Sequence, residues 1–120
     1  MSLGIIHTYP NNPRAFKAVI AAKYVGLQID LNKDFKFPDD KNKPEFLAKF
    51  PVGKVPVFEG KEGNLFESNA IAYYVAALKE SSGLLGKTAM EKAQVIQYMH
   101  FVANEIVPLG FKWLIPLLGY

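Results

Sequence analysis

The sequence predicts an α/β fold for residues 1–80 and an all-helical region after them. Short apolar runs bounded by turn residues, which are typical of strands, alternate with runs whose apolar residues recur every three or four positions, as in helices. Past a segment rich in glycine and serine, only the helical pattern continues. These two observations predict two parts of different structural class in one chain of 120 residues.

A strand and a helix are predicted first. The run GIIH, residues 4–7, indicates a strand because the turn residues TYPNNP end it. The helix that follows has Pro13 in its first turn and Gly26 at its C-terminal cap, which are favoured positions for these residue types. Apolar residues recur on one face of this helix, namely Phe16, Val19, Ile20 and Tyr24.

A second strand, a short helix, a hairpin and a third helix come next. LQIDLN, residues 27–32, alternates as a half-buried strand does, and the polar segment after it favours only a short helix at residues 44–49. Runs at residues 55–59 and 64–67 flank GKEG, which predicts a hairpin of antiparallel strands. Ser68 is placed to cap the next helix. The apolar face of that helix holds Ile71, Tyr74, Val75 and Leu78.

The helical region is expected at residues 89–120, after a linker at residues 81–88. Thr88 and Glu91 form a capping-box pattern that opens its first helix, and Pro108 is expected to end or kink that helix. Apolar residues surround most of this helix, so it should be covered on several sides. The closing run GFKWLIPLLGY is strongly apolar, which predicts the opening helices of a larger all-α domain and a surface able to form a homodimer.

Composition excludes several classes of function. The sequence has no cysteine, so disulfides, thiolate zinc sites and a cysteine nucleophile are excluded, and two histidines do not predict a metal site. No apolar run reaches the ~18 residues of a membrane span, and the start lacks a signal peptide pattern, so we expect a protein of the cytoplasm. The net charge is +3, and thirteen of the fourteen basic residues are scattered lysines, which favours a solvated surface over direct nucleic acid binding.

Pro56 stands at the start of an otherwise regular strand pattern. A proline there removes a hydrogen-bond donor, so it marks an edge strand or a cis peptide bond. The order β-α-β-α-β-β-α with a proline entering the third strand is that of a thioredoxin-like fold, in which this bond is cis. A cis bond between Val55 and Pro56 would turn the Val55 backbone outward, free to pair with an extended peptide.

Glu67 and Ser68 lie where a strand runs into a helix. The unpaired N–H groups and the positive dipole end of a helix N-terminus favour an anion there. These side chains could hold the α-amino and α-carboxylate groups of a small peptide, and Lys54 could meet a second carboxylate. Taken singly, Ser68 is also explained as a helix cap, Glu67 as a solvated strand end and Lys54 as a surface lysine.

Two motifs resemble the glutathione transferase superfamily, GKVPVFE and FESNAIAYYVA. Four longer segments are similar to the glutathione-transferase-like N-terminal region of the gamma subunits of eukaryotic translation elongation factor 1: TYPNNPRAFKAVIAAKYVG, NKPEFLAKFPVGKVPVFEG, LFESNAIAYYVA and IVPLGFKWLIPLLG. The resemblance runs from about Ile5 to the end of the chain. It implies a thioredoxin-like domain that scaffolds the nucleotide-exchange subunit of elongation factor 1 in protein synthesis.

The resemblance also implies residue roles in glutathione binding. Val55, beside Pro56, would pair with the cysteinyl backbone, Glu67 and Ser68 would hold the γ-glutamyl end, and Lys54 would meet the glycyl carboxylate. Glutathione is then the ligand or substrate, with no other cofactor.

The resemblance is weaker where a catalytic group is expected. Serine-type transferases place a hydroxyl about four residues before the arginine of the first helix, and counting back from Arg14 reaches Pro10, which has none. Thr8 and Tyr9 are the remaining candidates for activating the thiol. We therefore expect a scaffold, with a glutathione transferase acting on small electrophiles as the alternative.

Overall fold

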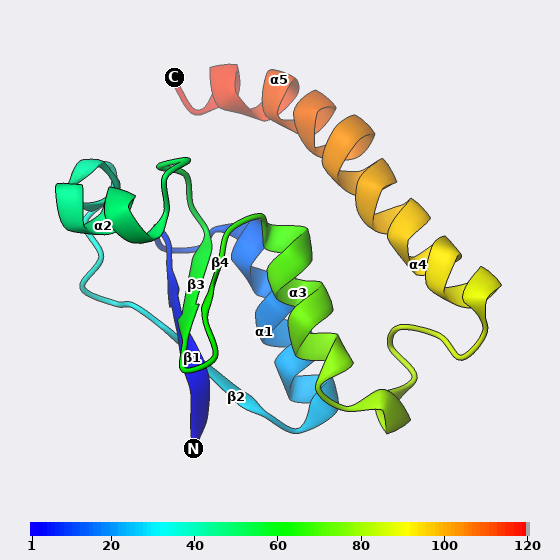
Figure 1. Ribbon diagram of the computed structural model, residues 1–120. Helices are drawn as coiled ribbons and strands as arrows, with labels where there is room; N and C mark the ends of the chain where they lie inside the picture. Colours follow the sequence, from blue (N-terminus) through cyan, green and yellow to red (C-terminus); the bar gives the residue numbers. More distant parts are fainter. Residues whose placement is uncertain (120) are drawn as a thin grey trace. The chain divides into compact units, whose positions relative to one another are not determined.

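The computed structural model describes residues 1–119 in two compact units, Met1–Leu84 and a second unit from Leu85 onward (Figure 1). Each unit is described by itself. Tyr120, the last residue of the predicted helical region, lies outside the described residues. The predicted division into residues 1–80, 81–88 and 89–120 stays a prediction.

The first unit is built on a four-stranded sheet. Its order is β2-β1-β3-β4, with β1 parallel to β2 and antiparallel to β3, and with β3 antiparallel to β4. The strands are β1 (Ser2–His7), β2 (Gln28–Leu31), β3 (Val57–Gly60) and β4 (Asn64–Leu65). This mixed sheet confirms the predicted α/β class and the thioredoxin-like order.

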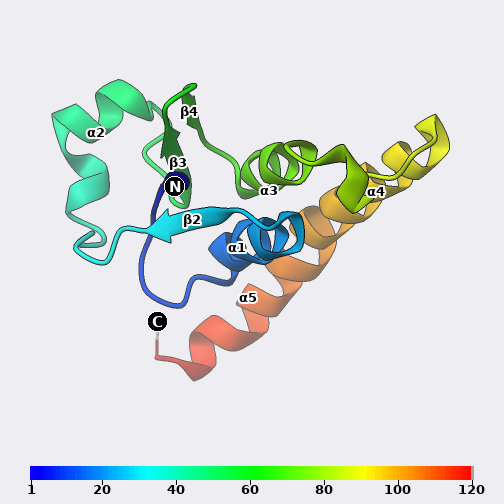
Figure 2. The same ribbon diagram turned by 90° about the horizontal axis from the view of Figure 1, so that it is seen from below.

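Helices cover both faces of this sheet. Figure 1 shows α1 and α3 together on one side of the strands and α2 on the other, and the view from below in Figure 2 agrees. The helices are α1 (Pro13–Val25), α2 (Pro44–Lys49) and α3 (Ser68–Ala77), with single 3-10 turns η1 (Asp40–Asn42) and η2 (Glu80–Ser82). All the elements predicted for this unit are therefore present.

The hairpin strands are shorter than predicted. β3 begins at Val57 because Pro56 has no N–H to join the ladder. β4 ends at Leu65, two residues before Glu67, whose φ of 69° lies in the left-handed region and takes the chain out of the strand.

The face of α1 predicted from its large apolar residues is not the buried one. Phe16 is 40% exposed and Tyr24 is 70% exposed. The buried residues are smaller: Ala15, Ala18, Ala22 and Val25. They pack toward α3, whose own buried face is Ile71, Ala72, Val75 and Ala76. Small side chains on both helices let the two backbones approach closely, and this close contact decides which face is buried.

Two apolar clusters form the core, one on each face of the sheet. On the α2 side, Val57 packs with Phe35, Phe46 and Phe50. On the other side, Phe58 is 2% exposed, and its ring centroid lies 5.7 Å from that of Tyr74 on α3. The alternation of Val57 and Phe58 in β3 thus supplies one large side chain to each cluster.

The second unit consists of α4 (Ala89–Phe101), the π-helical turn η3 (Val102–Ile106) and α5 (Val107–Leu117). The capping box is confirmed, since the Glu91 N–H donates to Thr88 Oγ1 at 3.2 Å and Glu91 Oε2 accepts from the Thr88 N–H at 3.0 Å. Pro108 lies in the first turn of α5, directly after the π turn, so the helical path continues past it.

The apolar side chains of the helix that Thr88 opens were predicted to be covered, but Tyr98, Phe101 and Ile106 are at least half exposed instead. The closing run was expected to lack packing partners, and its Trp113 is 72% exposed. No helix in residues 1–119 has both the length and the apolar character that crossing a membrane requires.

Candidate functional site

The predicted ligand-binding residues lie at one end of the sheet. β1 ends at His7, which pairs with Val57 at the start of β3, so the residues after β1 lie beside those before β3. β3 and β4 pair Phe58 with Leu65 and Glu59 with Asn64. The chain segments before Val57 and after Leu65 therefore both leave the same end of this two-stranded ladder.

The segment before β3 has the backbone form predicted for it. The Val55–Pro56 peptide bond is cis, as expected from the sequence. Pro56 is buried, and Val55 is half-buried against the apolar cluster on the α2 side. Lys54 is exposed. This segment therefore presents the Lys54 side chain to solvent, while Val55 and Pro56 are anchored in the interior.

The start of α3 differs from the prediction by one residue. Glu67, not Ser68, is the N-cap, and its side chain makes no capping hydrogen bond. Ser68 is the first residue of the helix. The backbone of Glu67, at φ 69° and ψ 111°, is in a conformation that residues other than glycine rarely adopt. Such conformations persist where the surrounding structure enforces them, and they gather at ligand sites.

Lys17 of α1 reaches this helix start, which the sequence analysis missed. Its ammonium group donates a hydrogen bond to Asn69 Oδ1, in the first turn of α3. Burial lowers the pKa of Lys17, the Arg14 charge lowers it further, and the Glu67 charge opposes both effects. Lys17 is four residues after Pro13, so the two residues share one face of α1. The packing of α1 against α3 then brings the Lys17 side chain to Asn69.

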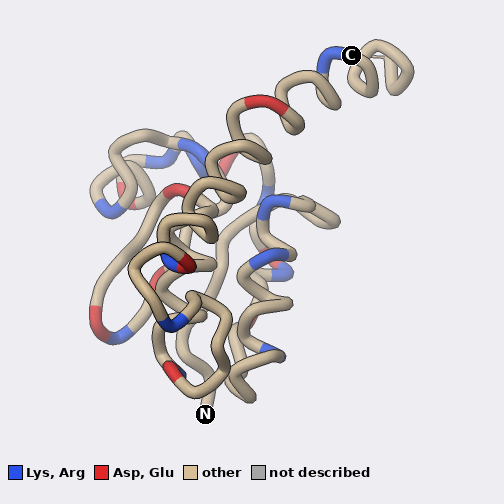
Figure 3. The backbone as a smooth tube through the Cα atoms, turned by 90° about the vertical axis from the view of Figure 1, so that its right-hand side faces the viewer, with Lys and Arg blue, Asp and Glu red and all other residues tan. Residues whose placement is uncertain are grey.

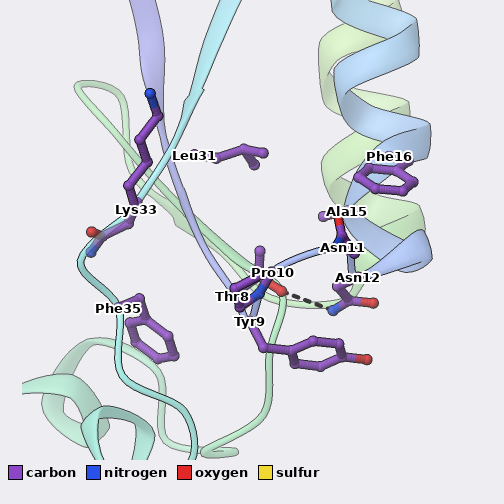
Figure 4. Close-up of a pocket in the computed structure, with 11 residues that line it drawn as sticks. Thr8, Tyr9, Pro10, Asn11, Asn12, Ala15, Phe16, Leu31, Lys33 and Phe35 are labelled. Carbon is purple, nitrogen blue, oxygen red and sulfur yellow. Dashed lines mark hydrogen bonds between the residues drawn. The ribbon is translucent and has the colours of Figure 1, made fainter.

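The turn between β1 and α1 is held by Asn12. Its side-chain oxygen accepts a hydrogen bond from the Arg14 N–H at 3.0 Å and caps α1, and its Nδ2 donates to Thr8 Oγ1 at 2.8 Å (Figure 4). Asn12 is 1% exposed and Thr8 is 6% exposed. The Thr8 hydroxyl is thus buried and engaged within the turn. The capping role of Asn12 was not predicted, although an asparagine directly before Pro13 is a recognisable helix cap.

A cavity of about 290 Å³ lies beside this turn. Its lining is mostly apolar or neutral, with one charged residue: Thr8, Tyr9, Pro10, Asn11, Asn12, Ala15, Phe16, Leu31, Asn32, Lys33 and Phe35. The Tyr9 ring packs 5.2 Å from that of Phe37, and Figure 4 shows it pointing away from Leu31 and Lys33. Thr8 and Tyr9, the two hydroxyl residues proposed from the sequence, therefore both line the cavity. Thr8 is buried in the turn, and the ring of Tyr9 packs on that of Phe37.

The family model of the glutathione S-transferase N-terminal domain matches residues 3–77. The chain belongs to this family. The match takes in all four strands, apart from Ser2 at the start of β1, and the helices α1 to α3. All of the ligand-binding residues predicted from the sequence lie within it.

Known proteins extend this likeness. Elongation factor 1-gamma of Artemia salina is 48% identical over 120 residues, which are 99% of this chain and 27% of that protein, so the chain spans little more than a quarter of that relative's length. A glutathione S-transferase of Pichia kudriavzevii has a TM-score of 0.69 and 31% identity, covering 88% of this chain and 51% of that one. A Sulfitobacter glutathione transferase homologue, solved with bound glutathione, has a TM-score of 0.72 and 26% identity, covering 87% and 50%. The predicted resemblance to elongation factor 1-gamma is confirmed.

In this glutathione S-transferase domain, a polar cluster lies on the α2 face of the sheet. Lys49 of α2 donates to Glu59 Oε1 at 2.5 Å, and His7 Nε2 lies 3.1 Å from Glu59 Oε2. The hydrogen bond from Lys49 is the largest effect that lowers the pKa of Glu59, burial opposes it, and His7 adds to the lowering.

Glu59→Gln is expected to reduce the stability of the domain by less than about 1 kcal/mol at neutral pH, the range of partly exposed ion pairs. Because folding lowers the pKa of Glu59, its contribution is present above its ordinary pKa and is lost as the pH falls through the folded value. Urea unfolding at neutral and acidic pH should therefore show a smaller acid-induced loss of stability in Glu59→Gln than in the unchanged chain. An equal loss in both would contradict this assignment.

Charges of both signs are spread along the domain. Figure 3 shows blue and red segments interspersed along the backbone rather than gathered in one element. Among residues 1–119, no group of three or more His, Asp or Glu side chains is arranged to hold a metal ion.

Proposed function

We propose that this domain is an assembly module of translation elongation factor 1, which anchors the nucleotide-exchange subunit in the cytoplasm. The observation that carries the proposal is the 48% identity to elongation factor 1-gamma over 99% of the chain. A likeness of that extent covers the helices of the second unit as well as the glutathione S-transferase fold.

The turn after β1 supports an assembly role over catalysis. A transferase needs a donor that stabilises the thiolate of glutathione. Pro10 has no hydroxyl, Thr8 is buried in the turn, and the Tyr9 ring packs on Phe37. The arrangement of these groups favours structure over thiol activation.

We also propose that the domain retains a glutathione site formed by Lys54, Val55, Pro56, Glu67 and Ser68. The cis bond before Pro56, the unusual backbone of Glu67 and the position of both segments at one end of the β3–β4 ladder support it. Lys17 would balance the charge of Glu67 beside the bound peptide. The related Sulfitobacter protein was solved with glutathione bound.

Co-purification tests the assembly role. The chain is expected to retain the nucleotide-exchange subunit of elongation factor 1 on an affinity column, in fixed proportion. Ser68→Ala should retain it equally, because that hydroxyl belongs to the proposed peptide site and not to the assembly surface. Failure of the unchanged chain to retain this subunit would overturn the proposal.

Calorimetric titration with glutathione, followed by a chlorodinitrobenzene conjugation assay in the same sample, tests the site and the alternative function. We expect binding that Ser68→Ala weakens, with no conjugation above the uncatalysed rate. Conjugation that Tyr9→Phe or Thr8→Val abolishes would instead establish a glutathione transferase. Absence of binding would refute the glutathione site and leave the assembly role to the first experiment.

The exposed apolar side chains of α4, η3 and α5 favour a homodimer as well. Sedimentation equilibrium of the chain alone tests this. A mass that stays monomeric over a wide range of concentration would exclude it.

A further inference from the structure

His7 connects four separate segments of the first unit. It is the last residue of β1, and its Nε2 faces Glu59 Oε2 of β3 at 3.1 Å. Its Nδ1 lies 2.9 Å from Nδ2 of Asn32, directly after β2. Its ring lies 6.4 Å from the ring of Phe46 in α2, centroid to centroid. The His7 side chain is 16% exposed, so water gives it few alternative partners.

The orientation of the Asn32 amide is fixed by the backbone. The Asp34 N–H donates to Asn32 Oδ1 at 3.0 Å, so the oxygen of this side-chain amide faces the backbone of Asp34. The Nδ2 group, which can only donate, is therefore the atom that faces the imidazole. The Asn32 contact is a hydrogen bond only if Nδ1 of His7 accepts it, which requires Nδ1 without a proton.

The contact on the other ring nitrogen requires the same protonation state. A carboxylate oxygen only accepts hydrogen bonds, so Nε2 must carry a proton in order to donate to Glu59. The opposite tautomer would set two donors against each other at Asn32 and two acceptors against each other at Glu59. Both contacts thus select one form of the ring.

We infer that His7 is a positioning residue, locked as the neutral Nε2–H tautomer, that orients the Glu59 carboxylate to hold Lys49 and thereby fixes α2 to the sheet. With Oε2 engaged by His7, Oε1 is the oxygen that meets the Lys49 ammonium at 2.5 Å. α2 ends at Lys49, and the segment with the cis bond follows it after a few residues. The inference does not depend on the proposed function, since it concerns the attachment of α2.

His7, Lys49 and Glu59 line a cavity of about 230 Å³, which three other charged residues also border. They are Asp40, Lys43 and Glu45, and the closest ion pair among them joins Lys43 Nζ to Asp40 Oδ1 at 2.7 Å. Because that pair is satisfied within the segment from η1 to α2, it does not tie the segment to the sheet. The polar link that His7, Glu59 and Lys49 make, by contrast, joins β1 and β3 to α2.

The nitrogen resonances of the histidine rings test the tautomer directly in the unchanged chain. A long-range proton–nitrogen correlation spectrum at neutral pH should show His7 with a protonated Nε2 and an unprotonated Nδ1. His100, which is exposed on α4, supplies the comparison spectrum in the same sample. An averaged pattern or a protonated Nδ1 for His7 would overturn the inference.

Two substitutions of similar size test the positioning role. His7→Gln can still donate to Glu59, whereas His7→Leu cannot, and both remove the aromatic ring. We expect amide hydrogen exchange of residues 46–49 to be about tenfold faster in His7→Leu than in His7→Gln. Equal exchange in the two variants would show that the ring acts only by packing and would overturn the role assigned to its N–H. The ring spectrum of the unchanged chain decides the tautomer even where a variant fails to fold.

Discussion

Phe58→Ala is expected to lower the free energy of unfolding by about 3–5 kcal/mol, the largest effect of any single substitution considered for this chain. Phe58 is 2% exposed and fills the core between the sheet and α3, where its ring lies 5.7 Å from that of Tyr74. Truncation removes this apolar contact and leaves a cavity that rigid neighbours in a sheet fill only in part. Urea unfolding followed by circular dichroism measures the change.

Phe16→Ala is the matched control for this substitution. It removes the same ring from a residue that is 40% exposed on α1, and alanine is the best helix former, so we expect a change of less than about 1 kcal/mol. Comparable losses in the two variants would mean that Phe58 does not occupy the core position described here.

Gly60→Ala is expected to destabilise the first unit by about 1–3 kcal/mol, although it adds only one carbon atom. A Cβ at this position would lie 2.6 Å from Cε1 of the Phe58 ring and 3.3 Å from the carbonyl oxygen of Leu3. The ring is buried, so it cannot move aside without disturbing its contacts on α3. The cost thus comes from the close approach of an aromatic ring to the strand backbone.

Gly110→Ala is the matched control, and it is expected to leave the stability unchanged or to raise it. Apart from its chain neighbours and the nearby backbone of its own helix, a Cβ there meets no atom within 4 Å. The residue lies inside α5, where alanine is favoured over glycine by about 0.5–1 kcal/mol. Thermal unfolding should therefore show a lower midpoint for Gly60→Ala and an equal or higher one for Gly110→Ala. A neutral result at Gly60 would show that the ring has room to shift.

Local chemistry made much of this fold predictable. The capping box at Thr88 and Glu91 needs only residues within one helical turn, and the proline at position 56 is informative because few positions in a sheet accept one. Each of these patterns determines its structure without help from distant parts of the chain. The same holds for the hairpin, whose loop composition and length define the register of β3 and β4.

The buried face of α1 could not be predicted from the sequence in this way. Ala18, Ala22 and Val25 recur at helical spacing, and so do Phe16, Ile20 and Tyr24, so periodicity alone does not choose between the two faces. The choice depends on α3, a helix more than 40 residues away in the chain, whose alanines make a close approach favourable.

The sequence predicted which segments form the candidate site, but not the contacts between residues distant in the chain. The residues beside Pro56 and Glu67 were predicted to lie together, but the link between Lys17 and Asn69 joins residues 52 positions apart. The contact of His7 with Glu59 spans the same separation. Neither pair has a local signature, because each depends on how helices and strands are placed around the sheet. The one-residue shift of the α3 cap, from Ser68 to Glu67, follows from a backbone conformation that composition does not reveal.

Large apolar residues usually tolerate substitution least, because they are usually the buried ones. The alanine contact between α1 and α3 makes the small residues of α1 the less tolerant ones. The outward aromatic and aliphatic side chains of α1 can be exchanged for other residue types with little effect on the interior, so this surface is free to adapt to a binding partner. Ala18 and Ala22 cannot grow by even a few atoms without forcing the two helices apart. Among related domains, the small buried residues of α1 should therefore vary least. The large exposed residues of α1 should vary with the partner that each domain binds.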